Sequence, residues 1–381
     1  MNQDKINLVT IVGTRPEIIR LSSIIRRLDN SNIIDHVLVH TGQNYDYELN
    51  EIFFHDLGIK KPSYYLDSAE KTPSITIGNI IRDVDKVLEK INPDALLILG
   101  DTNSCLSAIS AKKRKIPIFH YEAGNRCFDQ RVPEEINRKI VDHISDINIT
   151  YSDIAREYLI NEGISPDRII KIGSPMLEVI NDNESKIKKS KIISKLKIES
   201  NNFFLLSCHR EENVDNDINI KKLVDSINFL CEEYKMPIIF PIHPRTKKRI
   251  NHNNFKLNKL IKIISPVGFS DYCNLQKESF VVLSDSGTIF EESSILNFRA
   301  LNLRESHERP EAIEESSVVV TGLNKKRINQ GIKVLQAQTT GKSRNINIVN
   351  DYNVNNVSLK IERIILSYID YVNRVVWQKE F

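Results

Sequence analysis

Short apolar runs alternate along this chain with longer segments in which apolar residues recur at helical spacing. In the first half the runs cover residues 8–12, 36–40, 95–99, 117–119, 147–149 and 168–172. Runs of this length, bounded by polar and turn-forming residues, indicate buried strands, whereas the periodic segments between them indicate helices. Strands that alternate with helices predict a parallel sheet covered by helices.

The same alternation starts again after Pro175, with runs at residues 203–207, 237–241, 260–264, 280–283, 300–303 and 318–320. A region rich in Lys, Asn and Ser, residues 181–202, separates the two series, and an amphipathic helical pattern ends the chain. The simplest architecture is therefore α/β, with two doubly wound domains that face each other across a cleft. We expect the first domain to cover residues 1–174 and the second residues 175–361.

Length and composition support this architecture and exclude some partners. A chain of 381 residues exceeds the size at which one hydrophobic core usually stops growing. The net charge of +3 is too small to suggest a nucleic acid or an anionic membrane as partner. The first residues contain no apolar stretch long enough for a signal peptide or a membrane span. The five cysteines are odd in number and lack metal-ligand spacing, which is typical of reduced thiols in a cytoplasmic protein.

Acidic residues follow the central runs of the first series. Asp101 comes after residues 95–99, Glu122 comes after the next run, and the pair Glu134 and Glu135 follows a proline. Ligands collect where parallel strands end, and partly desolvated carboxylates at that edge are suited to proton transfer. Each carboxylate alone could equally cap a helix or pair with a nearby arginine.

Two turns have the chemistry of an anion site. The first is GTRPE, residues 13–17, where Thr14 and Glu17 suit a capping box and the helix N-terminus would attract a negative group. Arg15 is better placed than Arg20 to contact that anion, since Arg20 lies further into the helix. The turn is not GxGxxG, so a dinucleotide is not indicated. A plain capped helix is the alternative.

The second turn is SDSGT, residues 284–288, directly after the run 280–283. Its small residues let the backbone approach a diphosphate, and a carboxylate one turn later could accept hydrogen bonds from ribose hydroxyls. His209 and His243 each end a strand beside an arginine, which suits phosphate or sugar contacts, although a lone histidine is often structural. One anion turn in each domain suggests a nucleotide diphosphate.

Together the motifs GTRPE, HTGQN, GDT, EAG, PEEINR, HREEN, HPR, SDSGT and ERPE resemble the non-hydrolysing UDP-N-acetylglucosamine 2-epimerase family, in order from about Val9 to Leu323. The resemblance implies a GT-B-like fold in which a C-terminal helix, residues 362–381, packs back on the first domain. It also implies a homodimer that inverts C2 of a UDP-linked 2-acetamido sugar without a cofactor or a metal.

The resemblance also implies roles for individual residues. Catalytic roles go to Asp101, Glu122, Glu134 and His209, with Glu134 preferred to Glu135 and the division between acid and base left open. Contacts with UDP and sugar go to Arg15, Arg20, Gln43, Arg138, Arg210, His243, Phe269, Ser286, Gly287, Thr288, Glu292 and Arg309.

Departures from the common pattern bear on the substrate. The chain has GQN, HREEN and Arg20 where the common pattern has GQH, HRREN and a lysine. Together with residues 44–50, 124–129 and 291–296 these look like the capsule and O-antigen branch, which converts UDP-2-acetamido-2,6-dideoxy-β-L-talose to UDP-N-acetyl-β-L-fucosamine. The alternatives are an epimerase of UDP-N-acetylglucosamine and UDP-N-acetylmannosamine, or a GT-B glycosyltransferase.

Overall fold

The computed structural model describes residues 5–43 and 54–380. The chain forms two compact units, one made of Met1–Asp182 with Asn353–Phe381 and the other of Asn183–Tyr352. The border after Asp182 lies later than the expected border after residue 174, because helix α7 (Met176–Asp182) packs on α1 (Arg15–Asp29). Ser23 of α1 also donates a hydrogen bond of 2.6 Å to Asp182.

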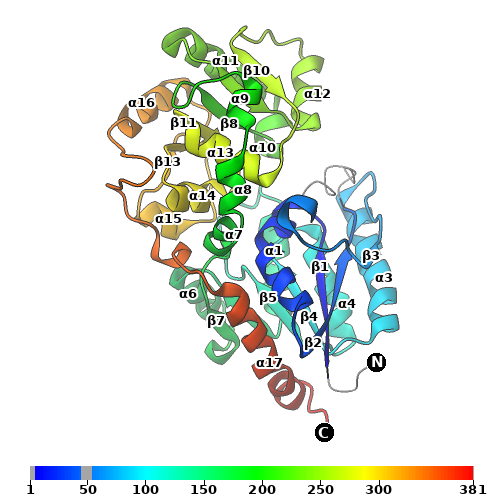
Figure 1. Ribbon diagram of the computed structural model, residues 1–381. Coiled ribbons are helices and arrows are strands. Elements are labelled where there is room, and N and C mark those ends of the chain that lie inside the picture. Colours follow the sequence, from blue (N-terminus) through cyan, green and yellow to red (C-terminus); the bar gives the residue numbers. More distant parts are fainter. Residues whose placement is uncertain (1–4, 44–53, 381) are drawn as a thin grey trace. The chain divides into compact units, whose positions relative to one another are not determined.

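The first unit contains a parallel sheet in the order β3-β2-β1-β4-β5-β6-β7 (Figure 1). Its strands are β1 (Ile6–Val12), β2 (Ile34–His40), β3 (Tyr64–Tyr65), β4 (Ala95–Leu99), β5 (Ile118–Tyr121), β6 (Ile147–Thr150) and β7 (Ile169–Lys171). All residues of β4 and β5 are buried, as expected of strands with helices on both faces. The edge strand β3 was not predicted, since two residues are too few to show a pattern.

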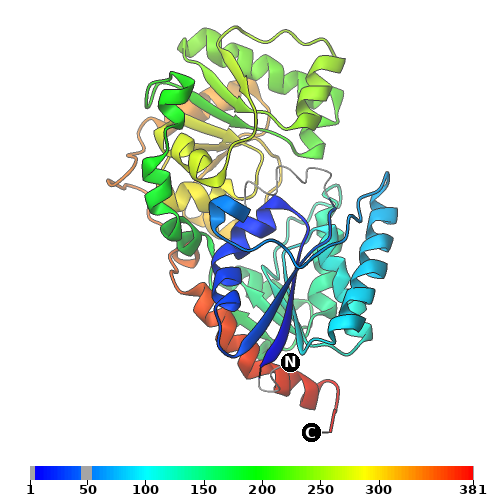
Figure 2. The same cartoon turned by 45° about the vertical axis from the view of Figure 1, so that its right-hand side comes forward.

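The other helices of this unit cover the sheet or return to it from the end of the chain. They are α3 (Pro73–Ile91), α4 (Ala108–Lys113), α5 (Glu134–Ile144), α6 (Asp153–Asn161) and α17 (Val357–Val375), with 3₁₀ turns η1 (Asn103–Ser107) and η2 (Pro166–Arg168). Helix α17 packs against α1, as Figures 1 and 2 show, with an ion pair of 2.7 Å between Arg27 and Glu362. No described helix is both long and apolar enough to cross a membrane.

The second unit contains a parallel sheet in the order β10-β9-β8-β11-β12-β13. Its strands are β8 (Phe204–Ser207), β9 (Ile238–Pro241), β10 (Ile261–Ile264), β11 (Val281–Ser284), β12 (Ala300–Asn302) and β13 (Val319–Val320). Its helices are α8 (Glu184–Lys189), α9 (Ile192–Leu196), α10 (Glu211–Val214), α11 (Asp217–Tyr234), α12 (Pro244–His252), α13 (Phe269–Glu278), α14 (Ile289–Leu296), α15 (Pro310–Glu314) and α16 (Lys325–Leu335), followed by the 3₁₀ turn η3 (Asn350–Tyr352).

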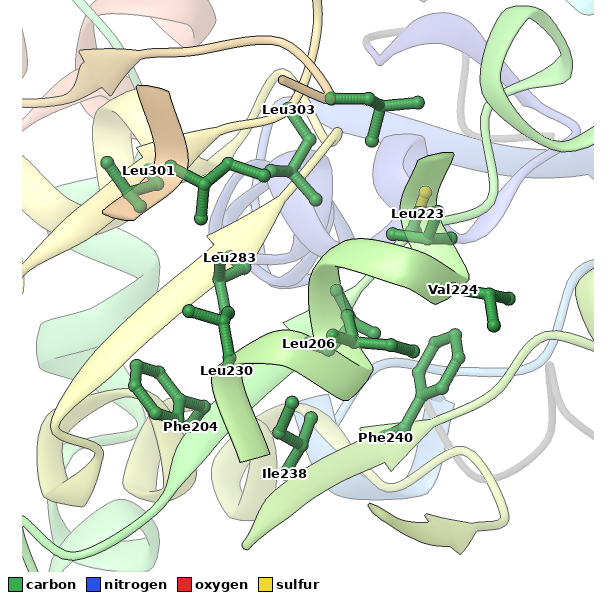
Figure 3. Packing of buried hydrophobic residues seen from close by; sticks show 14 of the residues in the cluster. Phe204, Leu206, Leu223, Val224, Leu230, Ile238, Phe240, Leu283, Leu301 and Leu303 are labelled. Carbon is green, nitrogen blue, oxygen red and sulfur yellow. The ribbon is translucent and has the colours of Figure 1, made fainter. Parts of the chain in front are cut away.

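Apolar side chains from the sheet and from α11 form the core of the second unit (Figure 3). Leu206 and Leu283 come from the central strands, and Leu223 and Leu230 come from the helix; all are at most 1% exposed. Burying side chains of this size contributes about 1.5–3 kcal/mol each. This core holds β8 and β11 side by side, and their ends carry the polar residues described next.

Candidate active site

In both sheets the order in which the chain adds strands reverses near the centre. The candidate residues follow strands at or next to these two points. In each unit the chain runs from the central strand to one edge and then crosses to the other side, which leaves a switch point between β1 and β4 and another between β8 and β11. Ligands of doubly wound sheets bind outside the carboxyl ends of the strands at such points. The first unit supplies carboxylates there, and the second supplies histidines and an anion turn.

The turn after β1 is built differently from the predicted capping box. Thr14 is the N-cap of α1, but its side chain accepts no backbone hydrogen bond. Its hydroxyl instead donates to Glu17 over 2.7 Å, while the N–H of Gly13 donates to the same carboxylate over 3.0 Å. Arg15 is the first helical residue and is half-buried. The glutamate half of the motif is therefore present and the threonine half is not.

Arg20, predicted to be the weaker anion contact, has a buried carboxylate partner. Its guanidinium forms an ion pair with Glu122, and both side chains are less than a tenth exposed. Tyr151 donates to the same carboxylate over 3.1 Å, and the Asn125 amide donates over 3.2 Å. Glu122 has a φ of +67°, a backbone conformation that non-glycine residues rarely adopt. These contacts fix the orientation of the Glu122 carboxylate at the carboxyl end of β5.

Asp101 also has an arginine partner. Arg138 of α5 lies 2.7 Å from its carboxylate and 3.1 Å from that of Glu135. Glu135 is 1% exposed and accepts a hydrogen bond of 3.1 Å from the N–H of Cys127. Glu134, the first residue of α5, is half-buried. Glu135 therefore has a structural role, and Glu134 is the more accessible member of the pair.

Gln43 contacts the loop that follows β4. Its side-chain oxygen accepts hydrogen bonds from the N–H and the hydroxyl of Ser104, at 2.9 and 2.7 Å. Ser104 follows Asp101 closely in sequence and lies at the start of η1. Gln43 thus links the end of β2 to the Asp101 loop. Residues 44–50, which were singled out for their resemblance to the capsule and O-antigen branch, lie outside the described residues.

Glu17 is a buried titratable group that the sequence patterns singled out only as part of a capping box. It is 1% exposed, and burial raises its pKa to about 7 against hydrogen bonds from Thr14, Gly13 and Thr102 that lower it. The Thr102 hydroxyl donates to it over 2.9 Å. Glu17 therefore joins the β1 turn to the residue next to Asp101. Its place in the first turn of a helix resembled a cap, and only long-range contacts distinguish the two roles.

This burial predicts a pH dependence of stability. The pKa of Glu17 is about 7 in the folded chain against an ordinary 4.5, so its contribution is fully present below pH 4.5 and is lost as the pH rises through 7. The loss amounts to about 3 kcal/mol. Glu17→Gln should flatten the plot of unfolding free energy against pH over this window. Glu89→Gln, at a 71% exposed side chain, should leave the slope unchanged; equal slopes in both variants would contradict the prediction.

In the second unit, Asp285 organises the loop that carries His209. It is fully buried, and its carboxylate accepts from the N–H groups of His209 and Arg210 at 3.0 and 2.9 Å and from the side chain of Asn213 at 3.2 Å. Burial alone would raise the pKa of Asp285, but the charge of His209 and these hydrogen bonds hold it below its ordinary value. The Nδ1 atom of His209 lies 3.6 Å from Asp285. This arrangement orients the imidazole.

His209 and His243 are neighbours, with ring centroids 6.1 Å apart. His243 caps α12, where its Nδ1 accepts from the N–H of Arg245 over 3.3 Å. Both histidines and Arg210 are half-buried, which keeps them accessible to a ligand. Glu211, which stands where the common HRREN pattern has arginine, pairs with Arg245 over 2.6 Å. Glu211 therefore neutralises the charge of Arg245, whereas an arginine at position 211 would add a second positive charge.

The SDSGT turn precedes α14 as predicted. The hydroxyls of Ser286 and Thr288 are 3.0 Å apart, and a Cβ placed on Gly287 would lie 3.7 Å from Glu308. Thr288 is the N-cap of α14 without a side-chain capping bond. Glu292, one turn later, is 7% exposed and accepts a hydrogen bond of 2.5 Å from Gln276. That contact fixes the carboxylate expected at the ribose.

Three predicted contact residues have almost no exposed side chain, and one of them is Arg138, which is 3% exposed. Phe269 is 3% exposed at the start of α13. Arg309 is 2% exposed and lies 3.6 Å from Glu291. Among the residues with described positions, no group of three or more His, Cys, Asp or Glu side chains could hold a metal ion, and the five cysteines are free thiols.

Comparison with known proteins gives the family. Residues 26–366 match the family described as UDP-N-acetylglucosamine 2-epimerase. The chain belongs to this family. It is an enzyme, a non-hydrolysing UDP-sugar 2-epimerase, as its sequence motifs predicted.

Solved structures and curated relatives of the epimerase family resemble the chain over nearly its full length. The structure of UDP-N-acetylglucosamine 2-epimerase from Rickettsia bellii is 50% identical, with a TM-score of 0.92 over 98% of this chain and 100% of that one. A UDP-GlcNAc 2-epimerase from Methanocaldococcus jannaschii, crystallised with UDP-GlcNAc and UDP, is 37% identical, with a TM-score of 0.88 over 95% and 99%. A UDP-2,3-diacetamido-2,3-dideoxy-D-glucuronate 2-epimerase from Pseudomonas aeruginosa is 32% identical over 87% of this chain and 93% of its own.

Proposed function

We propose that this epimerase inverts C2 of a UDP-linked 2-acetamido sugar by eliminating UDP and adding it back. No carbonyl group next to C2 acidifies its hydrogen, so direct removal and return of the proton would face a high barrier. Elimination takes the C2 proton and breaks the bond from C1 to the diphosphate, which leaves UDP and a glycal. Re-addition forms that bond again and delivers a proton to the opposite face of C2.

The observation that carries this proposal is the set of oriented carboxylates at the ends of β4 and β5. Arg20 and Tyr151 hold Glu122, and Arg138 holds Asp101. Groups held in this way can act without further reorganisation when a proton moves. Glu134, half-buried at a helix N-terminus, completes the set. We propose that these three share proton transfer at C2 and stabilise positive charge at C1.

The second unit is proposed to bind the departing nucleotide. Ser286, Gly287 and Thr288 offer backbone and hydroxyl groups to a diphosphate. Asp285 orients His209, so that Nε2 is the ring atom left to assist the leaving phosphate. Arg15 of the first unit would add positive charge to the same diphosphate. Excluding water from these groups during the reaction would keep the glycal from being diverted.

For the substrate we propose UDP-2-acetamido-2,6-dideoxy-β-L-talose, with UDP-N-acetyl-β-L-fucosamine as product for surface polysaccharide synthesis. The sequence departures support it, including Glu211, which pairs with Arg245 instead of supplying a second cation. The second candidate is the pair UDP-N-acetylglucosamine and UDP-N-acetylmannosamine, supported by the names of the Rickettsia bellii and Methanocaldococcus jannaschii relatives. The Pseudomonas aeruginosa relative carries the name of a third UDP-sugar, so family membership alone leaves the sugar open.

Reaction in deuterium oxide tests the chemistry and the substrate together. With its true substrate and no acceptor, the enzyme should place one deuterium at C2 of the epimer, detected by NMR, and release UDP and glycal on long incubation. Parallel reactions with the talose-configured sugar and with UDP-N-acetylglucosamine should differ by at least about tenfold in kcat/KM, since a misfitted hydroxyl costs 1–3 kcal/mol or more. An epimer without deuterium would refute the elimination. Stoichiometric free sugar would indicate hydrolysis, and turnover only with an acceptor would indicate a glycosyltransferase.

A further inference from the structure

The three candidate carboxylates come from three different elements of the first unit. Asp101 follows β4, Glu122 follows β5, and Glu134 begins α5. Two ionisable residues, His120 and Asp142, lie behind them, and both have 0% exposed side chains. His120 belongs to β5 and Asp142 to α5, so their contact joins two of the three elements directly.

His120 faces an acceptor with each ring nitrogen. Its Nε2 lies 2.7 Å from the carbonyl oxygen of Gly100, and its Nδ1 lies 2.9 Å from Oδ1 of Asp142. A neutral imidazole has one N–H and can donate to only one of them, whereas an imidazolium donates to both. Gly100 immediately precedes Asp101. The ring therefore connects the Asp101 loop to α5.

Asp142 extends the connection to the loop after Glu122. Its carboxylate accepts from the N–H of Gly124 at 3.2 Å and from the guanidinium of Arg126 at 2.7 Å. Arg126 in turn donates to Glu162 over 2.7 Å. Positive and negative groups alternate along this chain of contacts, as buried charges require. The left-handed backbone of Glu122 (φ +67°) lies between His120 and Gly124, and these contacts hold it on both sides.

We propose that His120 is a positioning residue for the epimerisation, which as a buried imidazolium paired with Asp142 sets the relative placement of Asp101 and Glu122. The proposal rests on the function proposed above, since it assumes that these two carboxylates exchange protons with the substrate. His120 touches neither the substrate nor the reacting atoms. It acts through the Gly100 carbonyl and through its positive charge.

The charged groups that face His120 agree with this role. Burial lowers the pKa of His120, but the hydrogen bond and charge of Asp142, the Gly100 carbonyl and the charge of Asp101 together raise it above its ordinary value. Arg126 pairs with the same Asp142, and its like charge opposes a positive charge on His120. A fixed positive charge near Asp101 favours the ionised carboxylate, so its removal should make Asp101 easier to protonate.

Two variants separate the contacts of the ring. His120→Gln reaches the position of Nε2 and keeps a donor for Gly100, whereas His120→Asn reaches the position of Nδ1 and keeps a partner for Asp142; both remove the charge. We expect each to lower kcat by about 10- to 100-fold with KM within about threefold, because carboxylates misplaced by a fraction of an ångström still bind the substrate. The acid limb of the kcat/KM profile should move up by about one pH unit.

The control is His143→Gln, which replaces a half-exposed histidine. This histidine lies 3.3 Å from Glu162, the carboxylate that pairs with Arg126. It should leave kcat and the acid limb unchanged. Asp142→Asn should reproduce the effect of His120→Gln, and the double variant should be no worse than either single one. A lowered kcat with an unmoved acid limb, or additive losses in the double variant, would overturn the proposal.

A measurement on the unaltered enzyme does not depend on how the variants fold. NMR with ¹⁵N-labelled histidine should show an imidazolium that persists above the pH at which ordinary histidines become neutral. A spectrum with neutral rings only would overturn the proposal. If the unaltered enzyme failed to exchange deuterium at C2, the proposed function would fall, whereas a persistent imidazolium would still report the His120 geometry.

Discussion

Replacing Glu122 by glutamine should lower kcat by about 10²- to 10⁴-fold, the range expected when a group that transfers protons is lost. Glutamine keeps the size of the side chain and can still accept from Tyr151, so the backbone at this position need not change. Affinity for UDP should stay within about threefold, because Glu122 is not among the residues proposed to contact the diphosphate. Steady-state kinetics and calorimetric titration with UDP measure the two effects separately.

The matched control is Asp153→Asn, an acidic residue of the same unit with a 71% exposed side chain in a surface ion pair with Lys171. Exposed pairs contribute about 0–1 kcal/mol, so kcat should not change. Glu122→Gln with normal turnover would remove Glu122 from the proton-transfer set. Loss of UDP binding in parallel with kcat would show instead that the ion pair with Arg20 supports the fold of the site.

Replacing Gly124 by alanine should produce the largest loss of stability among single changes near the site, about 3 kcal/mol or more. Gly124 has a φ of +82°, and a Cβ there would lie 2.3 Å from the carbonyl oxygen of Ala155 and 2.9 Å from its carbonyl carbon. Both are backbone atoms of α6, which cannot rotate away. Thermal or denaturant unfolding of the purified variant measures the loss.

Gly163→Ala separates collision from backbone strain. Gly163 has a similar φ of +90°, but nothing lies within 4 Å of the position of its Cβ. It should therefore lose only about 1 kcal/mol, the cost of the left-handed conformation. Equal losses at the two positions would mean that strain, and not the contact with α6, explains the need for glycine at position 124.

Much of this site was predictable because its residues follow strands with simple patterns. The run 95–99 is buried throughout in the structure, as β4, and the residue that comes soon after a buried parallel strand must lie at the edge of the sheet. Asp101 and Glu122 were therefore placed at that edge from local sequence alone. The turns at residues 13–17 and 284–288 were found in the same way.

Other features could not be predicted, because they depend on residues far apart in the chain. Arg20 was ranked below Arg15 as an anion contact because it lies further into the helix, and its partner Glu122 lies 102 positions later. Glu17 resembled a helix cap in the sequence, and only the structure shows that the Thr102 hydroxyl donates to it. Phe269 and Arg309 were expected to contact the substrate, and nothing in the local sequence showed that the packing of the second unit buries both.

The sequence by itself determined the α/β class, the two series of strands, the family, and the strand ends that carry Asp101 and Glu122. These follow from local periodicity and from motifs, which depend on neighbouring residues. Only the tertiary structure decided the order of the strands, and with it the switch points where these ends meet. It also decided that a buried histidine, His120, joins the loops of two carboxylates, since contacts between distant segments depend on how each crossover packs and leave no periodic trace in the sequence.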